Sequence, residues 1–518
     1  MTDTDVIIVG AGPTGLMLAA ELCLAGVRPL ILERHPQLRD TPKAHGLGGQ
    51  ILQLLHYRGL LERIRAAVTD PTPAPIFPFG GVHLDFTHLA DPPLEGLPLP
   101  QRRLERLLDE HARELGADIR RGHEVVGVSQ DDATVTADVR GPDGPYRVTA
   151  RYLVGCDGAR SRVRGLAGIP FPGTTYPEVN RLAQVSMPDS VTMLDNGDLD
   201  VPELGRIRTG FTRTDRGVFA VGSLTPGVLF LQTTEDELTE VDDDVPMTMT
   251  ELQGSIRRVL GGNLPLGDPI RLSRYQFQAR QAERYRDGRI LLAGDAAHLL
   301  PATGSAMNVG MLDAVNLAWK LAADINGWAP TGLLDTYHDE RHFAGARALL
   351  QTRAQVALRR GHDPAAEALR AVIQELLVDE QPLRRMGALI AGTDIRYPLP
   401  NSDQHALTGT FAPDLTLHTD QGTTSVAELV RTARPVLLDL ADRPDLREIA
   451  RDWQHRIDIH TAKTEDRPAD ALLIRPDAQI AWAATIDEPA DAAALALREA
   501  LSCWFGTPRK SAVPTTSV

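Results

Sequence analysis

The sequence predicts an α/β protein made of a Rossmann-like dinucleotide-binding domain, an inserted antiparallel-sheet domain and a C-terminal α/β domain. Three observations carry this prediction: a glycine-rich βαβ unit at residues 5–33, short strand patterns over residues 170–285, and a new strand-and-helix pattern after residue 414. The 518 residues are enough for three or so domains at roughly 150 residues each. A chain of this length can bury large cores without disulfides or structural metals.

The first βαβ unit has the features of a dinucleotide-binding fingerprint. The run VIIV after Asp5 predicts a buried strand, LMLAAELCLAG predicts a helix that ends near Gly26, and VRPLILE predicts a strand that ends at Glu33. Between them, GAGPTG supplies the tight turn, the close approach to a pyrophosphate and the close helix packing that such a site needs. The predicted nucleotide-binding residues of this unit are Gly10, Gly12, Pro13, Thr14, Gly15, Glu33 and Arg34.

Glu33 narrows the choice of nucleotide. It comes 23 residues after Gly10, at the end of the second strand, where a carboxylate accepts hydrogen bonds from a ribose. Because this carboxylate would repel a 2′-phosphate, the AMP half of FAD or NAD fits better than NADP. The fingerprint alone does not separate FAD from NAD, and a glycine-rich turn without a ligand remains the alternative interpretation.

The remaining elements follow in order along the chain. Helices are predicted over ILQLLHYRGLLERI (51–64), residues 101–115, TELQGSIRRVL in the middle region, NVGMLDAVNLAWKLAADING and onward to about residue 392, with strands at 123–154 and RILLAGD. The segment 396–414 is rich in Pro, Ser, Asn and Gly and is predicted to be a linker. The predicted domains are 1–169 with 286–395, then 170–285, then 396–518.

Composition and charge exclude several classes of protein. The chain has 54 basic and 69 acidic residues, a net charge of −15, whereas a nucleic-acid-binding protein needs a concentrated positive surface. At 42% hydrophobic and 24% charged residues, it is typical of a globular protein and not of a disordered chain. The N-terminus has aspartates where a secretory signal carries basic residues, and no run of about 18 apolar residues suits a membrane span.

The cysteines and histidines indicate that neither disulfides nor a metal site are to be expected. Cys23, Cys156 and Cys503 form no CxxC pair and are a poor disulfide framework, so we expect a soluble protein of the reducing cytoplasm. The histidines have no spacing such as HExxH, so no metal site is expected.

Two further motifs select FAD. YLVGCDGARSRVR places Asp157 and Gly158 after a strand, and RILLAGDAAH places Gly294 and Asp295 after another. With the N-terminal fingerprint, in this order and spacing, the chain resembles the group A FAD-dependent monooxygenases, aromatic hydroxylases with a para-hydroxybenzoate hydroxylase-like fold. The resemblance implies that Asp295 binds the ribityl chain of FAD and that Asp157 lies near the pyrophosphate and the path of NAD(P)H. It also implies that Gln101, in PLPQRRLERLL, contacts the flavin.

The C-terminal region carries a more specific resemblance. ALLIRPDAQIAWAATIDEP is similar to the thioredoxin-like domain of the aromatic polyketide hydroxylases and rifampicin-type monooxygenases. Without a CxxC pair this domain has no dithiol chemistry, so packing or subunit contact is its expected role. The sequence leaves the oligomeric state open, a homodimer included.

Two segments depart from the family pattern. Thr303, Gly304, Ser305 and Ala306 stand where relatives have Gly-Gly-Gln-Gly close to the flavin ring, and Cβ atoms there would crowd it. Lys43 replaces an arginine and loses its planar fork. We still predict a flavin site, to which these segments contribute Lys43, Gly304, Ala306, Met307 and Asn308.

The resemblance implies an enzyme that uses FAD, NADPH or NADH, and O2 to hydroxylate a polycyclic aromatic polyketide or similar phenolic compound, as in antibiotic biosynthesis, through a flavin C4a-hydroperoxide. Baeyer–Villiger oxygenation, or a flavoprotein with redirected or lost oxygenase activity, are the alternatives. No catalytic side chain is predicted, because the chemistry belongs to the cofactor. His298 is expected to be structural, and Phe211, Phe219 and Phe230 either wall the substrate or pack in a core.

Overall fold

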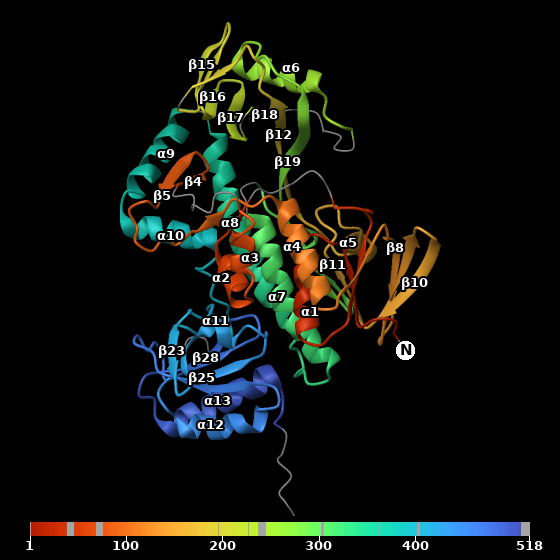
Figure 1. Cartoon of the computed structure of the whole chain (residues 1–518), viewed down its shortest axis with the longest axis vertical. Helices are drawn as coiled ribbons and strands as arrows, with labels where there is room; N and C mark the ends of the chain where they lie inside the picture. The colour runs from red at the N-terminus through yellow and green to blue at the C-terminus, as the bar shows by residue number, and fades with distance from the viewer. Residues whose placement is uncertain are drawn as a thin grey trace, which may run out of the picture. The chain divides into compact units, whose positions relative to one another are not determined.

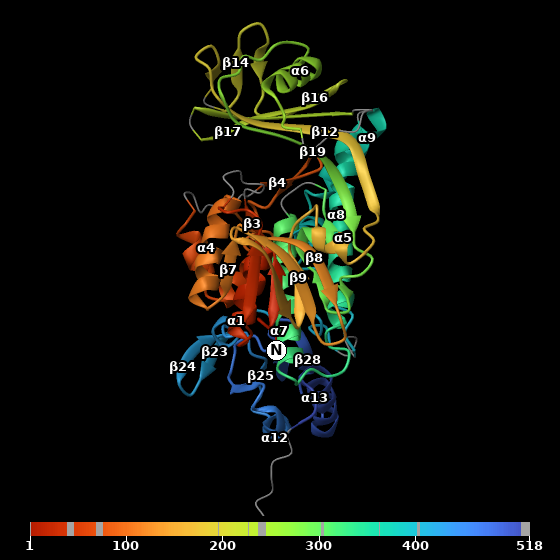
Figure 2. The same ribbon diagram turned by 90° about the vertical axis from the view of Figure 1, so that its right-hand side faces the viewer.

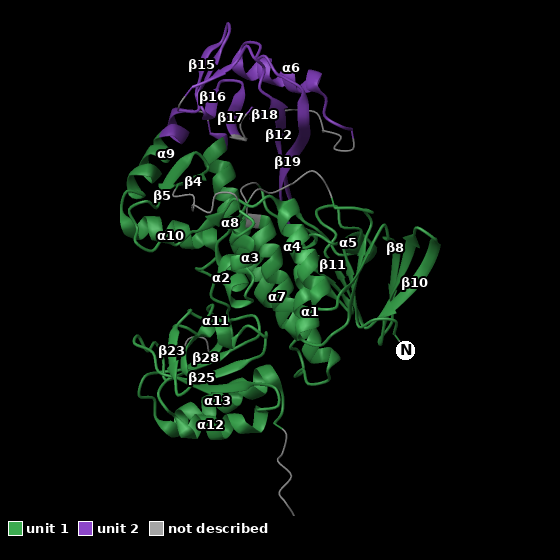
Figure 3. Ribbon diagram, in the orientation of Figure 1, with its two compact units in different colours: residues 1–172, 281–359, 368–518 green, residues 173–280, 360–367 purple. Residues whose placement is uncertain are grey.

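The structure is a computed structural model, and it forms two compact units (Figure 3). Unit 1 comprises residues 1–172, 281–359 and 368–518, and unit 2 comprises residues 173–280 and 360–367. Predicted boundaries at residues 169/170 and 285/286 lie within a few residues of those of unit 2, whereas a separate domain from residue 396 stays a prediction. The described residues are 2–38, 46–68, 76–194, 196–225, 227–236, 245–301, 305–361, 363–400 and 405–508.

A mainly parallel sheet forms the centre of unit 1 (Figure 1). Its strand order is β20-β21-β11-β1-β2-β7, with only the short β20 antiparallel to its neighbour. The strands are β1 (Val6–Val9), β2 (Pro29–Glu33), β7 (Asp118–Arg121), β11 (Tyr152–Gly155), β20 (Arg286–Asp287) and β21 (Ile290–Leu292). All four residues of β1 are buried, as the run VIIV predicts for a strand covered on both faces.

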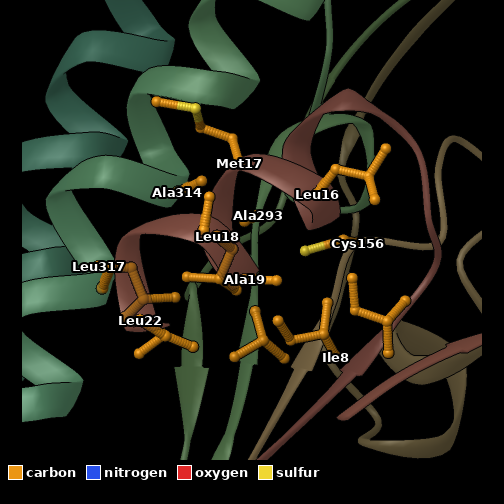
Figure 4. Close-up of a cluster of buried hydrophobic side chains, with 14 of the residues drawn as sticks. Ile8, Leu16, Met17, Leu18, Ala19, Leu22, Cys156, Ala293, Ala314 and Leu317 are labelled. Atoms are coloured by element: carbon orange, nitrogen blue, oxygen red, sulfur yellow. The ribbon is translucent and has the colours of Figure 1, made fainter. Parts of the chain in front are cut away.

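Helix α1 (Pro13–Leu24) packs between this sheet and helix α7 (Ser305–Ile325). Figure 4 shows Leu18, Ala19 and Leu22 of α1 between strand β1 and the side chains of Ala314 and Leu317 on α7. Pro13 starts α1 because its fixed φ suits the first helical position, where an N–H group has no helical partner. Helix α4 (Gln101–Glu114) packs beside α1, so three helices that are far apart in the sequence lie together.

An antiparallel sheet of β8 (Glu124–Gln130), β9 (Val135–Gly141) and β10 (Gly144–Ala150) contacts strands β1 and β2 and is seen in front of them in Figure 2.

The predicted single helix at residues 51–64 is wrong, because Gly59 takes φ +70° and separates two helices. The further elements of unit 1 and of the connection to unit 2 are α2 (Gln50–Tyr57), α3 (Leu61–Arg65), α5 (Arg162–Leu166), α8 (Thr336–Arg360), α9 (Pro364–Leu376), α10 (Glu380–Ala391), β3 (Leu47–Gly48), β4 (Ile76–Phe79), β5 (Val82–Asp85), β6 (Gly96–Leu97), β22 (His298–Leu299) and the 3-10 turn η1 (Gly294–Ala296).

The C-terminal part of unit 1 has the predicted thioredoxin-like topology. Its sheet has the order β26-β25-β27-β28, with β25 and β26 parallel and the other pairs antiparallel. The elements are β23 (Thr416–Thr419), β24 (Gly422–Ser425), β25 (Val436–Asp439), β26 (Asp458–Thr461), β27 (Ala471–Ile474), β28 (Ile480–Ala484), α11 (Val426–Leu429), α12 (Pro444–Ala450), η3 (Arg451–Trp453) and α13 (Ala490–Phe505).

The segment predicted to be a linker is partly packed. Tyr397 is 2% exposed and accepts a hydrogen bond of 2.7 Å from Arg341, and the hydroxyl of Tyr57 donates to the carbonyl oxygen of Ala412 at 2.7 Å. The polar composition of this segment therefore did not predict that Tyr397 and the carbonyl oxygen of Ala412 hold it to the helices by hydrogen bonds. Of residues 396–414, the structure leaves 401–404 outside its description.

Unit 2 is the predicted antiparallel sheet, in the order β16-β17-β18-β12-β19. Helix α6 covers one face, over Phe219 and Leu231. Phe219 is therefore a core residue, whereas Phe211, which pairs with Ala220, lies on the other face and is 58% exposed. The elements are α6 (Met249–Leu260), β12 (Gly173–Ser186), β13 (Thr192–Met193), β14 (Leu199–Val201), β15 (Gly205–Ile207), β16 (Gly210–Thr214), β17 (Gly217–Thr225), β18 (Val228–Asp236) and β19 (Pro269–Gln281).

Among the helices that the structure describes, none is long and apolar enough to cross a membrane.

Candidate functional site

A cleft of about 460 Å³ opens at the carboxyl ends of β1, β2, β11 and β21 in unit 1. In open α/β sheets this edge is where ligands bind. The cleft brings together most of the predicted site residues from four separate segments of the chain. Those that line it are Gly10, Gly12, Pro13, Thr14, Glu33, Arg34, Gln101, Asp157, Gly158, Asp295, Ala306 and Met307.

Three of the predicted residues that the structure describes do not line this cleft. Gly15 and Gly294 lie beside it and act through packing, and Asn308 lies in the first turns of α7. Lys43, Thr303 and Gly304 fall outside the described residues. Of the residues that depart from the family pattern, the structure therefore describes Ser305 and Ala306.

The three glycines of the first turn have different physical reasons. A Cβ at Gly15 would lie 2.0 Å from the carbonyl oxygen of Gly10, and one at Gly10 would lie 2.5 Å from that of Cys156, so both positions exclude a side chain. A Cβ at Gly12 would meet no atom within 4 Å among the described residues. Gly12 lines the cleft, so its missing side chain leaves room for a ligand and is not explained by packing.

The N-terminus of α1 faces this same space. Gly12 is its N-cap and has no side chain to accept from the first free N–H groups of the helix. Unpaired N–H groups and the positive end of the helix dipole bind phosphate oxygens well.

Glu33 holds the glycine turn in place. Its Oε2 accepts the backbone N–H of Ala11 at 2.8 Å, and its Oε1 accepts that of His35 at 2.8 Å. Each carboxylate oxygen has a further lone pair, so Glu33 can still accept from ribose hydroxyls. Because its carboxylate stands at the edge of the cleft, it disfavours a phosphate at the 2′ position.

Asp157 has a structural task that the sequence reasoning did not assign. Its carboxylate accepts the backbone N–H of Arg162 at 2.7 Å, that of Val163 at 3.1 Å and the hydroxyl of Ser161 at 2.5 Å. Asp157 therefore caps the start of α5 with Ser161, and this fixes the loop whose Gly158 takes φ +83° at the cleft.

Thr14 is the meeting point of the first turn, the Gly294 turn and α7. A Cβ at Gly294 or at Gly310 would lie 2.7 Å from the Thr14 hydroxyl, and one at Gly310 would lie 2.9 Å from Cα of Gly294. Gly310 was missed by the sequence reasoning. A glycine in the interior of a helix costs stability, and that alone could have indicated a close approach at this position.

Asp313 was also missed. It is fully buried on α7, and its Oδ2 accepts the backbone N–H of Gly294 at 2.9 Å and lies 2.8 Å from Nε2 of His298, while Arg341 donates to its Oδ1 at 2.7 Å. Burial would raise the pKa of Asp313, but Arg341, His298 and the Gly294 N–H hold that pKa below its ordinary value. An aspartate among apolar helix residues, in GMLDAVNLAW, was the available signal.

The predicted structural role of His298 fits this arrangement, because the residue is completely buried and held by Asp313. Four arginines of the cleft wall were also not predicted as site residues: Arg102, Arg121, Arg160 and Arg162. Arg121 donates to Asp109 at 2.8 Å, and Arg162 lies 3.0 Å from Glu124. Three of the four arginines stand in the segments that were interpreted only for Gln101 and Asp157, and Arg121 ends a strand without a recognisable motif.

The donor set fits a dinucleotide. A glycine cradle with free space, a helix N-terminus and a carboxylate at the end of the second strand are the three parts that a pyrophosphate and a ribose need. Among the described residues, no group of three or more His, Cys, Asp or Glu side chains could hold a metal ion.

Comparison with known families decides which dinucleotide is bound. A FAD-binding domain model matches residues 3–352, and an aromatic-ring hydroxylase C-terminal model matches residues 405–508. The chain belongs to the FAD-dependent aromatic-ring hydroxylases. The predicted family and fold class are therefore confirmed, and FAD is the cofactor of this hydroxylase-family chain.

Individual relatives cover nearly the whole chain. The 12-dehydrotetracycline 5-monooxygenase/anhydrotetracycline 6-monooxygenase of Streptomyces rimosus subsp. rimosus is 41% identical over 513 residues, which are 97% of this chain and 99% of the relative. Dialkyldecalin synthase of Streptomyces rugosporus is 38% identical over 98% of this chain and 99% of its own. The solved structure of anhydrotetracycline hydroxylase from Streptomyces rimosus superposes with a TM-score of 0.86 at 40% identity, covering 98% of this chain and 100% of that one.

Proposed function

We propose that this protein is a monooxygenase that hydroxylates a polycyclic aromatic polyketide or a similar phenolic compound. The net reaction is substrate–H + O2 + NAD(P)H + H⁺ → substrate–OH + H2O + NAD(P)⁺, which balances atoms and electrons. The observation that carries the proposal is the Gly12 cradle with Glu33 beside it, in a chain whose family oxygenates aromatic rings.

The residues of the cleft bind and orient the cofactor. The N–H groups at the start of α1 would hold the pyrophosphate, Glu33 would accept from the adenosine ribose, and Asp295 would accept from the ribityl chain. Gln101, Ala306 and Met307, which line the same cleft, would contact the flavin ring. The chemistry supplied by bound FAD is the transfer of two electrons from reduced nicotinamide to O2.

The first turn of α7 contributes electrostatics. Ala306 and Met307 line the cleft just after the helix begins at Ser305, so the positive end of the helix faces the site. Such an end stabilises negative charge on the reduced flavin ring.

The substrate class rests on the relatives, two of which are named for tetracycline intermediates. A cytoplasmic location and a homodimer are part of the proposal. The location is supported by the free thiols of Cys23, Cys156 and Cys503.

One relative favours a second candidate, a flavoprotein with redirected activity. Dialkyldecalin synthase, at 38% identity, is named for ring formation and not for oxygenation. Baeyer–Villiger oxygenation is the third candidate, because the same reactants insert oxygen into a ketone. The bound cofactor is the same in all three.

Heavy-isotope O2 separates the candidates. FAD-loaded protein is incubated with NADPH and either anhydrotetracycline or a panel of planar polyphenols, and the products are analysed by mass spectrometry and NMR. One heavy oxygen per product as a ring hydroxyl supports hydroxylation, and one as a new ester or lactone supports Baeyer–Villiger insertion. A product without heavy oxygen, or FAD that NADPH does not reduce with any compound, overturns the monooxygenase proposal.

A further inference from the structure

Arg271 is an unsatisfied cation on strand β19 of unit 2. Its Nε and Nη1 atoms are buried, and neither has a hydrogen-bond partner among the residues that the structure describes. Burial lowers the pKa of Arg271 from its ordinary value, and among the described residues the nearby Tyr275 opposes this shift. Buried guanidinium groups are normally paired, because the loss of hydration is otherwise uncompensated.

A neighbour on the same strand shows the usual solution. Arg274 points to the opposite face, and its Nη1 donates to Glu251 of α6 at 2.7 Å. Arg181, beside it on β12, shares Glu251 at 2.8 Å and also pairs with Glu235. The covered face of the sheet thus supplies carboxylates to its arginines, and the open face supplies none to Arg271 among the described residues.

The open face can be followed row by row from the strand register. Gln184 stands opposite Arg271 on one side and opposite Phe230 on the other, so the three side chains share a face. In the next row, Leu182 stands between Ser273 and Gln232. All six are half-buried, and helix α6 lies on the other side of the sheet.

Aromatic and amide side chains lie on the same face of the sheet as Arg271. Phe211 pairs with Ala220, which pairs with Gln232, so it belongs to the same row as Leu182. At 58% exposed it presents a free ring face. Rings and an aliphatic side chain bind flat apolar molecules, and amide side chains donate to and accept from oxygens on the rim.

We propose that Arg271 binds an ionised oxygen of the substrate, and that the substrate is therefore a planar phenol, enol or carboxylic acid taken up as its anion. This inference rests on the proposed function, since it assigns the ligand of the open face to the oxygenated compound. A guanidinium fork and an anionic oxygen form a charge-assisted hydrogen bond, about twice as strong as a neutral one. The ligand thereby gives Arg271 the partner that the chain itself does not.

A pair of fluorescent probes tests charge at constant ring shape. Hydroxynaphthoate is an anion at neutral pH, whereas naphthol is neutral, and both are titrated into FAD-loaded protein. Arg271→Gln is expected to weaken hydroxynaphthoate binding by roughly tenfold to a hundredfold, as for a lost bond to a charged group, and naphthol binding by less than about twofold. Arg271→Lys should restore part of the preference, because it keeps the charge.

Arg274→Gln is the matched control. It removes a guanidinium three residues away on the covered face, so it should lower the melting temperature and leave the ratio of the two affinities unchanged. Equal weakening of both probes by Arg271→Gln, or unchanged hydroxynaphthoate binding, overturns the proposal.

Stability of the ligand-free protein gives an independent readout. Arg271→Met keeps an unbranched apolar stem and removes the unsatisfied charge, so the melting temperature should stay the same or rise while the stabilisation by hydroxynaphthoate is lost. A lower melting temperature would mean that a carboxylate of the chain already pairs with Arg271, and would overturn the proposal. Retained probe selectivity without heavy-oxygen incorporation would sink only the monooxygenase proposal, whereas incorporation with no selectivity would sink only this one.

Discussion

Nε of Arg341 lies 2.7 Å from Oδ1 of Asp313, and the other oxygen of that carboxylate accepts the backbone N–H of Gly294 at 2.9 Å. Arg341 also donates to the hydroxyl of Tyr397 at 2.7 Å. One buried pair thus connects α8, α7, the turn before Asp295 and the segment that leads to the C-terminal sheet. Asp313 and Arg341 are positioning residues, since neither is among the described residues that line the cleft and Asp313 accepts the N–H of Gly294 beside it.

Asp313→Asn should weaken FAD binding and lower stability. The substitution leaves the guanidinium of Arg341 buried without its full charge partner, which costs about 3–5 kcal/mol, and it loosens the turn at Gly294. We expect FAD to dissociate at least tenfold more readily in a flavin fluorescence titration. Arg347→Gln, on the same helix as Arg341, breaks a more exposed pair with Asp394; it is the control and should retain FAD. Normal FAD affinity in a folded Asp313→Asn protein would show that the pair does not position the turn.

Gly12→Ala and Gly15→Ala should separate ligand space from packing. At Gly12 the new methyl meets no described atom within 4 Å, so the apoprotein should melt at the wild-type temperature while FAD affinity falls by roughly tenfold or more. At Gly15 the methyl lies 2.0 Å from the Gly10 carbonyl oxygen, so both quantities should fall. Thermal melting of FAD-free protein and FAD titration measure the two effects. A Gly12→Ala protein that binds FAD as tightly as wild type would contradict the cradle.

Phe219→Ala should destabilise the protein, whereas Phe211→Ala on the other face of the same sheet should not. Phe219 is fully buried under α6, and its truncation should cost about 3–5 kcal/mol of unfolding free energy. Phe211 is 58% exposed, so its truncation should change unfolding free energy by less than about 0.5 kcal/mol. Urea unfolding measures both, and an increased KM for substrate in Phe211→Ala alone would support a ligand on the open face. A large destabilisation by Phe211→Ala would refute this assignment of faces.

The sequence predicted the parts of the site that lie in contiguous motifs. Gly10, Gly12 and Glu33 stand within one βαβ unit, where strand, turn and helix have fixed geometry, so their convergence follows from local structure. The order of the three motifs also placed Asp157 and Asp295 at the same edge of the sheet, because parallel strands end together.

What the sequence could not predict depends on contacts between distant segments. Asp313 and Gly310 belong to a helix whose interior residues were read only for their periodicity, and their partners Gly294 and Thr14 come from other motifs. Tyr397 lies in a segment of linker-like composition, yet Arg341 anchors it. Burial of a polar residue is decided by its partner, and partners that are 19 or 56 residues away leave no local pattern.

The stability of the protein should fall in acid partly through Glu340. This buried carboxylate of α8 accepts from both Nη atoms of Arg475 at 2.7 Å and from Lys320 at 2.9 Å. Burial would raise the pKa of Glu340, but Arg475 and Lys320 outweigh it and lower that pKa from 4.5 to about 2.

The sign of the effect follows from where the proton binds. Below pH 4.5 the unfolded chain takes up a proton on Glu340 while the folded protein keeps the residue ionised down to about pH 2. The contribution of Glu340 is therefore complete above pH 4.5 and is lost as the pH falls through this window, in total roughly 3 kcal/mol. Glu340→Gln should be less stable at pH 7, because Arg475 and Lys320 lose their shared counter-charge, and its stability should fall less steeply between pH 4.5 and pH 2.

Urea unfolding at a series of pH values measures the difference between the two proteins. Glu380→Gln removes a carboxylate of an exposed pair with Arg384, and its curve should run parallel to that of the wild type. Arg475 directly follows β27 of the C-terminal sheet, and Glu340 lies on α8. The same pair therefore joins the thioredoxin-like part to the helix that carries Arg341. If Glu340→Gln and wild type lose stability in parallel down to pH 2, the ion pair does not hold these two parts together in acid.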